Sequence, residues 1–202
     1  MKTLKDHIDE ALKIGKNLSK FSTYSCQPKT KQELEKIINN RIAEDGPECN
    51  LNDIDVSQIE DMSAVFYRSS FNGDISKWNV SKVEDMSSMF SESKFNGDIS
   101  NWNVNKVENM SAMFYGSKFN QDISKWDVSK VEDMYSTFYQ SKFNQDISNW
   151  NVSNVTDMSY AFALSSFNRD ISNWNIRKDC DTFNIFIGAP IEEQFKPKAL
   201  QK

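Results

Sequence analysis

The chain has 202 residues and is mildly acidic, with 24 Lys and Arg against 29 Asp and Glu and a formal net charge of -5. No stripe of basic residues stands apart from the acids, and no stretch approaches the roughly 20 apolar residues of a membrane span, which disfavours nucleic-acid binding and membrane insertion. The only histidine is His7, and no phosphate-binding or dinucleotide-binding glycine motif occurs. We therefore expect a protein that is not an enzyme and needs no cofactor.

The first 21 residues place apolar side chains at near-helical intervals among charged ones, which predicts an amphipathic helix that docks on the rest of the chain or binds a partner. The apolar positions are Leu4, Ile8, Ala11, Leu12, Leu18 and Phe21. We assign residues 1–26 to this helix and its link. The opening residues lack the apolar segment of a signal peptide, which predicts a cytoplasmic location. A chain trimmed of its leader would look the same, and would then lie at the cell surface or be secreted.

A second helix is predicted after Thr30, because Thr30 and Glu33 form a capping-box signature. One face of the following segment is apolar up to about Glu44, through Leu34, Ile37, Ile38 and Ile42. Gly46 suits the end of this helix. A stack of repeats must cover the bare end of its first repeat, so we expect residues 27–50 to form a helical N-terminal cap.

A 24-residue unit then repeats without a gap from Leu51 to Asp170, and a degraded sixth copy begins at Ile171. Four apolar columns fix the period: Met62, Met86, Met110, Met134 and Met158; Phe66, Phe90, Phe114, Phe138, Phe162 and Phe186; Phe71, Phe95, Phe119, Phe143 and Phe167; and Trp78, Trp102, Trp126, Trp150 and Trp174. A fixed period of this size is typical of units that bury their apolar faces against their neighbours. The sequence predicts a solenoid of about six coils over 51–194, followed by a tail over 195–202.

Within one coil, the alternation Trp78-Asn79-Val80 predicts a short strand that points Trp and Val inward and Asn outward. Asp85 precedes Met86, and two more apolar residues follow three and four positions on, which predicts one or two helical turns with Asp85 as the N-cap. The predicted fold class is therefore a repeat solenoid of the α+β type, with one short strand and one short helical turn per 24-residue coil.

The segment Trp150-Asn-Val-Ser-Asn-Val-Thr-Asp-Met-Ser-Tyr-Ala-Phe-Ala-Leu-Ser165 resembles the repeat of the BspA-like leucine-rich-repeat family of bacterial surface proteins, in its short-repeat branch of unassigned function. The segment 51–59 resembles the first, atypical coil of that family, and the resemblance extends over about residues 27–194. It implies a leucine-rich-repeat-like fold and, for secreted members, surface display and adhesion. The Asn that usually follows the strand is replaced by Val, so we expect the buried Asn ladder to be absent or to lie at Asn72, Asn96, Asn120, Asn144 and Asn168.

Two faces of the solenoid are candidates for partner binding. The polar columns on the predicted strand face are Lys77, Asn101, Lys125, Asn149 and Asn173, and Asn79, Asn103, Asp127, Asn151 and Asn175. This face has few of the aromatic and Arg side chains that dominate interface energies. The alternative is a turn face that carries Tyr67, Tyr115 and Tyr139, which either form a contact patch or lie partly buried between coils.

Two chemical alternatives remain open in the sequence. The repeated acids Asp74, Asp98, Asp122, Asp146 and Asp170 suit either calcium binding or local capping of backbone N–H groups, and the second is the simpler interpretation. The sparse cysteines Cys26, Cys49 and Cys180 suggest free thiols, with a bridge between Cys26 and Cys49 as the alternative.

The expected function is a non-enzymatic module of the leucine-rich-repeat type that binds a protein or serves in adhesion. We expect a monomer rather than a homodimer. The alternatives are a cytoplasmic regulator or inhibitor that uses the N-terminal helix, and a calcium-dependent repeat protein.

Overall fold

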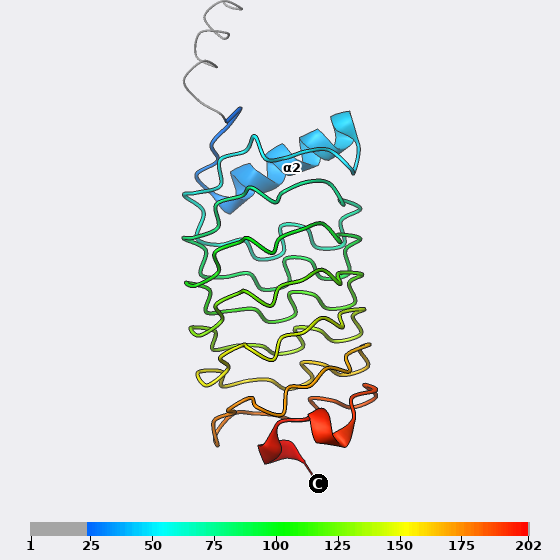
Figure 1. The fold of residues 1–202 in the computed structure, drawn as a ribbon. Coiled ribbons are helices and arrows are strands. Elements are labelled where there is room, and N and C mark those ends of the chain that lie inside the picture. Colours follow the sequence, from blue (N-terminus) through cyan, green and yellow to red (C-terminus); the bar gives the residue numbers. More distant parts are fainter. Residues whose placement is uncertain (1–23, 202) are drawn as a thin grey trace, which may run out of the picture.

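The computed structural model describes residues 24–201, so the amphipathic helix expected over residues 1–21 lies outside the described residues. The chain winds into a stack of coils. Helix α2 (Lys31–Asp45) covers one end, and the short 3-10 helices η1 (Glu193–Phe195) and η2 (Lys198–Leu200) lie at the other (Figure 1). The repeat architecture predicted from the 24-residue period is confirmed.

Helix α2 lies where the capping box predicts a helix. The Thr30 hydroxyl accepts a hydrogen bond from the Glu33 backbone N–H at 3.2 Å. At the other end, Gly46 has a φ of 87°, and its N–H donates to the Ile42 carbonyl. Leu34 and Ile38 are buried in the same apolar cluster as the first coil. The helix therefore shields from water the apolar surface that a first repeat leaves bare.

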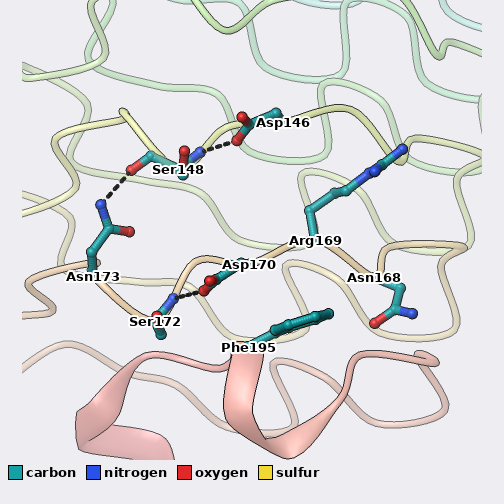
Figure 2. Close-up of a pocket in the computed structure, with 8 residues that line it drawn as sticks. All are labelled: Asp146, Ser148, Asn168, Arg169, Asp170, Ser172, Asn173 and Phe195. Atoms are coloured by element: carbon teal, nitrogen blue, oxygen red, sulfur yellow. Dashed lines mark hydrogen bonds between the residues drawn. The ribbon is translucent and has the colours of Figure 1, made fainter.

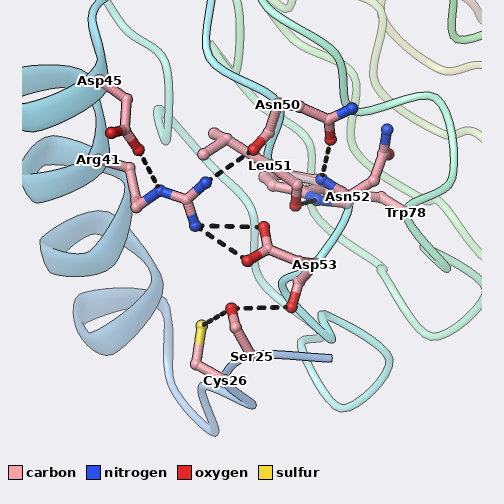
Figure 3. Close-up of polar contacts among 9 residues, drawn as sticks. All are labelled: Ser25, Cys26, Arg41, Asp45, Asn50, Leu51, Asn52, Asp53 and Trp78. Atoms are coloured by element: carbon pink, nitrogen blue, oxygen red, sulfur yellow. Dashed lines mark hydrogen bonds and ion pairs between the residues drawn. The ribbon is translucent and has the colours of Figure 1, made fainter. Parts of the chain in front are cut away.

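Arg41 joins α2 to the first coil (Figure 3). Its guanidinium donates to the carboxylates of Asp45 at 2.8 Å and Asp53 at 3.0 Å, and to the Asn50 carbonyl at 3.0 Å. The hydrogen bond to Asp45 is the largest of the effects that raise the pKa of Arg41, and the one to Asp53 follows. These contacts fix the orientation of the helix across the end of the stack.

The strand predicted at Trp78-Asn79-Val80 was wrong. In the described part of the chain, the only strand-like pairings between coils are isolated parallel bridges, most of them at the position just before the Met column: Asp61, Asp85, Asn109, Asp133, Asp157 and Asp181. The N–H of Trp78 donates to Ile75 within the coil, and the Asn79 amide oxygen accepts the N–H of Ser81. The tight turns on both sides use the backbone groups that a strand ladder would need.

The helical turn predicted after Asp85 was also wrong. The segment from Met86 to Ser93 is a ribbon of consecutive β-turns in which Ser88 and Glu92 have φ near 55°. Left-handed residues every four positions are incompatible with a right-handed helix. Alternate N–H groups close the turns, and the others donate to the next coil, as Phe90 does to the Met113 carbonyl at 2.9 Å. We call this segment and its copies the turn ribbons: 62–69, 86–93, 110–117, 134–141, 158–165 and 182–189.

The core is a set of parallel aromatic columns. The rings of Phe66 and Phe90 stack with centroids 5.5 Å apart, and those of Trp78 and Trp102 stack at 6.3 Å. Each Trp indole N–H also donates to a carbonyl of the preceding coil, as Trp102 does to Ile75 at 3.1 Å. These positions are buried throughout the stack except at Phe186, which is half-buried. The repeated aromatic residues therefore serve as core, with their polar atoms satisfied between coils.

An Asn ladder runs along one corner of the stack, at the position that the sequence predicted. The amide oxygen of each Asn accepts the backbone N–H one coil further on, at 2.8 Å within the repeats: Asn72 to Asn96, Asn96 to Asn120, Asn120 to Asn144 and Asn144 to Asn168. A last bond joins Asn168 to the N–H of Glu192 at 3.1 Å. The ladder lies nearer the solvent than the buried one we expected, because its members are half-exposed or exposed.

The sixth coil closes only part of the C-terminal end. The Phe195 carbonyl accepts the N–H of Ile171 at 2.9 Å, and Pro197 is buried beside η1. Phe186, whose five counterparts in earlier coils are 2 % exposed or less, is only half-buried. The cap therefore covers the corner near Ile171 more completely than the last turn ribbon.

Candidate functional site

The ten polar side chains of the first candidate face are all exposed. Several of them serve the backbone of their own coil: the side-chain oxygens of Asn79, Asn103, Asp127 and Asn151 each accept the N–H two residues on. The hydrogen bonds from Ser129 hold the pKa of Asp127 below its usual range. This face is accessible, but much of its hydrogen-bonding capacity closes local turns.

The three Tyr residues of the second candidate face are in two different situations. Tyr67 is exposed near the N-terminal end, with the Arg68 guanidinium 5.0 Å from its ring centroid. Arg68 in turn donates twice to Glu92, at 3.0 Å each. Tyr115 and Tyr139 are half-buried and stack at 4.9 Å. The structure thus brings two of the three together and leaves the first apart.

A larger cluster surrounds this pair, and we call it the aromatic patch: Tyr115, Tyr135, Tyr139, Tyr160, Leu164, Phe183 and Ile187. Tyr160 lies at its centre, edge-on to Tyr135 at 6.3 Å, Tyr139 at 6.4 Å and Phe183 at 5.5 Å. The backbone N–H of Leu164 donates to the Ile187 carbonyl at 2.7 Å, so these two residues are also adjacent. The patch follows the last turn ribbons toward the C-terminal end.

The patch exposes large apolar side chains to solvent. Leu164 is 49 % exposed, Phe183 59 % and Ile187 53 %. Sequence reasoning did not identify these three as site residues. The signal that could have identified them is a departure from the repeat: Tyr135 and Phe183 stand where Ser63, Ser87, Ser111 and Ser159 stand elsewhere, and Leu164 stands where Arg68, Glu92, Gly116 and Gln140 do.

A hollow of about 540 Å³ lies between the last coils and Phe195 of η1 (Figure 2). Its walls are Asp146, Ser148, Asn168, Arg169, Asp170, Ser172, Asn173 and Phe195. The carboxylates of Asp146 and Asp170 each accept a Ser N–H at 2.9 Å, and the bond from Ser172 lowers the pKa of Asp170. The Arg169 guanidinium donates to the Asn144 carbonyl. These polar groups therefore hydrogen-bond to the backbone of the coils themselves.

The same local bond is made by every member of this Asp column, from Asp74 to Asp170, which confirms the capping role predicted for it. Within residues 24–201, no three His, Cys, Asp or Glu side chains gather in a way that could hold a metal ion.

The three cysteines are free, so the alternative bridge between Cys26 and Cys49 does not form. Burial raises the pKa of Cys49, and it raises the pKa of Cys180 to about 11. Reactive thiols have lowered pKa values, so neither of these two thiols resembles a nucleophile.

The coils, turn ribbons and aromatic columns define the class of the protein, a repeat solenoid. The family model described as a Mycoplasma protein of unknown function, DUF285, matches residues 32–141 and again 109–197, and the chain belongs to this repeat family. No curated protein and no solved structure matches the chain. Between residues 24 and 201, no helix has the length and apolarity needed to cross a membrane.

Proposed function

We propose that the protein is a non-enzymatic module of the leucine-rich-repeat type that binds another protein through its aromatic patch. The supporting observation is that large apolar side chains cluster on the surface, exposed to solvent, at positions where other coils carry Ser, Arg, Glu or Gln. Protein interfaces are enriched in aromatic side chains, and a few such anchors supply most of the binding energy. An exposed apolar cluster of this kind typically marks an interaction site.

The polar face is the weaker candidate. Its ten exposed residues are Lys, Asn and Asp, with no aromatic or Arg anchor among them. The net charge of -5 also favours a protein partner over a nucleic acid. Adhesion at the cell surface, as in the BspA-like family that the repeat resembles, is one setting for such binding. Regulation of a cytoplasmic partner is the other.

The chain itself supplies the substitutions that test this proposal. Tyr135→Ser, Phe183→Ser and Leu164→Gln together replace patch residues by those that stand at the same positions in other coils. This repeat-restoring variant should therefore fold. The matched control is Asn79→Ser with Asn103→Ser, which changes the polar face and keeps a hydroxyl near each turn.

The experiment is affinity capture from a lysate of the source cell, quantified by mass spectrometry. We expect the repeat-restoring variant to capture at least about tenfold less partner than the parent protein, and the control variant to capture as much as the parent. Retention by the repeat-restoring variant with loss in the control would assign binding to the polar face. A third arm lacks residues 1–21, and loss of the partner in that arm alone would support the alternative that the N-terminal helix makes the contact.

A further inference from the structure

The turn ribbons are joined to one another by a regular row of backbone hydrogen bonds. In the last internal interface, four alternate N–H groups donate at 2.7 to 3.0 Å to four alternate carbonyls of the next ribbon: Met158 to Asp181, Tyr160 to Phe183, Phe162 to Ile185 and Leu164 to Ile187. The same register joins each earlier pair of ribbons. Each ribbon is therefore an acceptor toward the preceding coil and a donor toward the following one.

Within the described residues no coil follows the ribbon 182–189, and its row of donors is open. The backbone N–H groups of Thr182, Asn184, Phe186 and Gly188 have no acceptor among residues 24–201. All four belong to one side of the ribbon, whose carbonyls are engaged on the other side. Because the peptide dipoles of each column are aligned along the stack, this edge carries partial positive charge, as the start of a helix does. It needs acceptors.

Apolar surface flanks this donor row. Phe183 and Ile187 alternate with the open N–H groups and are the two most exposed large apolar side chains of the described residues. Phe186 is half-buried where its counterparts are covered by the next coil. The cap formed by η1 and Pro197 contacts the Ile171 corner instead. The edge therefore lacks the backbone partner and the apolar cover that every internal coil receives from its neighbour.

We propose that this edge binds a polypeptide segment of the partner, which lies along residues 182–188, supplies carbonyls to the four N–H groups and covers Phe186 with an apolar side chain. In effect the partner provides the ribbon of a further coil. Addition of a chain to an open edge is a common mode of peptide recognition. The inference rests on the proposed function and specifies how the partner is held at the C-terminal end of the aromatic patch.

A second copy of this chain is a poorer occupant. Two donor edges cannot pair, because neither supplies carbonyls. The complementary row, the carbonyls of Asp61, Ser63, Val65 and Tyr67 in the first ribbon, belongs to the end that α2 covers (Figure 1). There Lys31 of α2 donates to the Ser63 hydroxyl at 2.6 Å and lies 3.8 Å from the Asp61 carboxylate. A stacked copy would have to displace this helix.

The test uses the full chain and a synthetic peptide with the sequence of residues 107–120, which contains one turn ribbon and its acceptor carbonyls. Amide hydrogen exchange, followed residue by residue by NMR, reports the open edge directly. We expect the amides of Thr182, Asn184, Phe186 and Gly188 to exchange much faster than those of their counterparts in the preceding ribbon. Saturating peptide should slow them by at least about tenfold.

The specificity control places charge on the edge. Phe183→Lys with Ile187→Lys should weaken peptide binding at least about tenfold, because charged side chains beside an open edge disfavour chain addition. Tyr67→Lys, an exposed aromatic position at the other end of the turn face, should leave it unchanged. No binding at about 1 mM peptide, or binding that leaves the four amides unprotected, would overturn the proposal.

Sedimentation of the free protein at the same concentration tests the other occupant. Self-association that protects the four amides and is abolished by the Lys pair would assign the edge to a second copy and overturn the assignment to a partner segment. The proposed function is tested separately. If the peptide fails while the repeat-restoring variant still loses its partner, the edge inference falls and the function stands. If the peptide binds and protects the four amides while the repeat-restoring variant still captures every protein, the edge inference stands and the proposed function falls.

Discussion

Asp133 shows how one position of the repeat carries an electrostatic cost. Its carboxylate accepts the N–H of Tyr135 at 2.8 Å, but its side chain is half-buried in a column that also holds Asp85 and Asp157. Burial raises the pKa of Asp133, and the charges of Asp157 and Asp85 raise it further. The charged form is therefore less favourable in the folded protein than in the unfolded chain. In the next coil toward the N-terminus, the same position is Asn109, which makes the same bond without the charge.

We predict that Asp133→Asn stabilises the fold at pH 7. A carboxyl group with a raised pKa contributes stability at low pH and loses it as the pH rises through the folded-state pKa, and the substitution removes this loss. The midpoint of thermal unfolding should rise on the order of 2 °C at pH 7, and the gain should vanish at a pH below the ordinary Asp value. Asn109→Asp is the control and should have the opposite sign. A gain that persists unchanged at low pH would show that the charge is not the cause.

Other carboxylates have the reverse effect. The Ser124 N–H holds the pKa of Asp122 below its usual value, and the hydrogen bonds of Ser129 do the same for Asp127. Groups with lowered pKa values contribute stability that is present above their unfolded pKa and is lost as the pH falls through the folded one. Acidification should therefore weaken the turns that these residues close. The same acidification removes the cost of the charged Asp133 carboxylate in the folded protein.

At the scale of the element, the turn ribbon departs most from sequence-based expectation. The spacing of Met86, Met89 and Phe90 suits a helix. In the structure the segment is a ribbon of turns, and it still directs all three side chains into the core. Its left-handed positions are mostly occupied by residues other than Gly, although Gly116 and Gly188 stand at one of them with φ of 60° and 70°. Each such non-Gly residue carries a conformational cost.

We predict that Gln140→Gly stabilises the protein by about 1 kcal/mol, because Gln140 has a φ of 53° and Gly tolerates this region without strain. The reciprocal control is Gly116→Gln, which should destabilise by a similar amount. A Cβ at Gly116 would meet nothing closer than 3.5 Å, so its cost would come from the backbone conformation. Urea unfolding measures both differences. Equal stabilities for the parent and both variants would contradict the assigned strain.

At the scale of the whole molecule, stability comes from contacts between neighbouring coils. The aromatic columns, the Asn ladder and the ribbon bonds all join one coil to the next, so the interface is the same wherever it occurs in the stack. In such a structure, the free energy of unfolding is approximately a sum of repeat and interface contributions. The two ends are where this regularity stops, and one of them is covered by α2.

We predict that a second copy of residues 110–133, inserted after Asp133, keeps the protein folded and raises its stability. The insertion adds one 24-residue coil with both of its interfaces. The midpoint of thermal unfolding should rise by roughly 2–4 °C for each kcal/mol gained. As a control, the same insertion with its Met, Phe and Trp replaced by Ser should lower the midpoint. Aggregation of the unmodified insertion would count against a modular stack.

Much of the architecture could be predicted from the sequence because it depends on periodicity. The period determined the stack, the buried Met, Phe and Trp columns and the corner of the Asn ladder, and the capping box marked the start of α2. Only the tertiary structure decided how the backbone passes through each coil. Three or four apolar positions in a short segment do not distinguish a helical turn from a ribbon of β-turns, since the choice depends on hydrogen bonds to coils 24 residues away. The aromatic patch and the open donor edge were likewise decided by tertiary structure, because exposure at the end of a stack depends on which neighbour is missing.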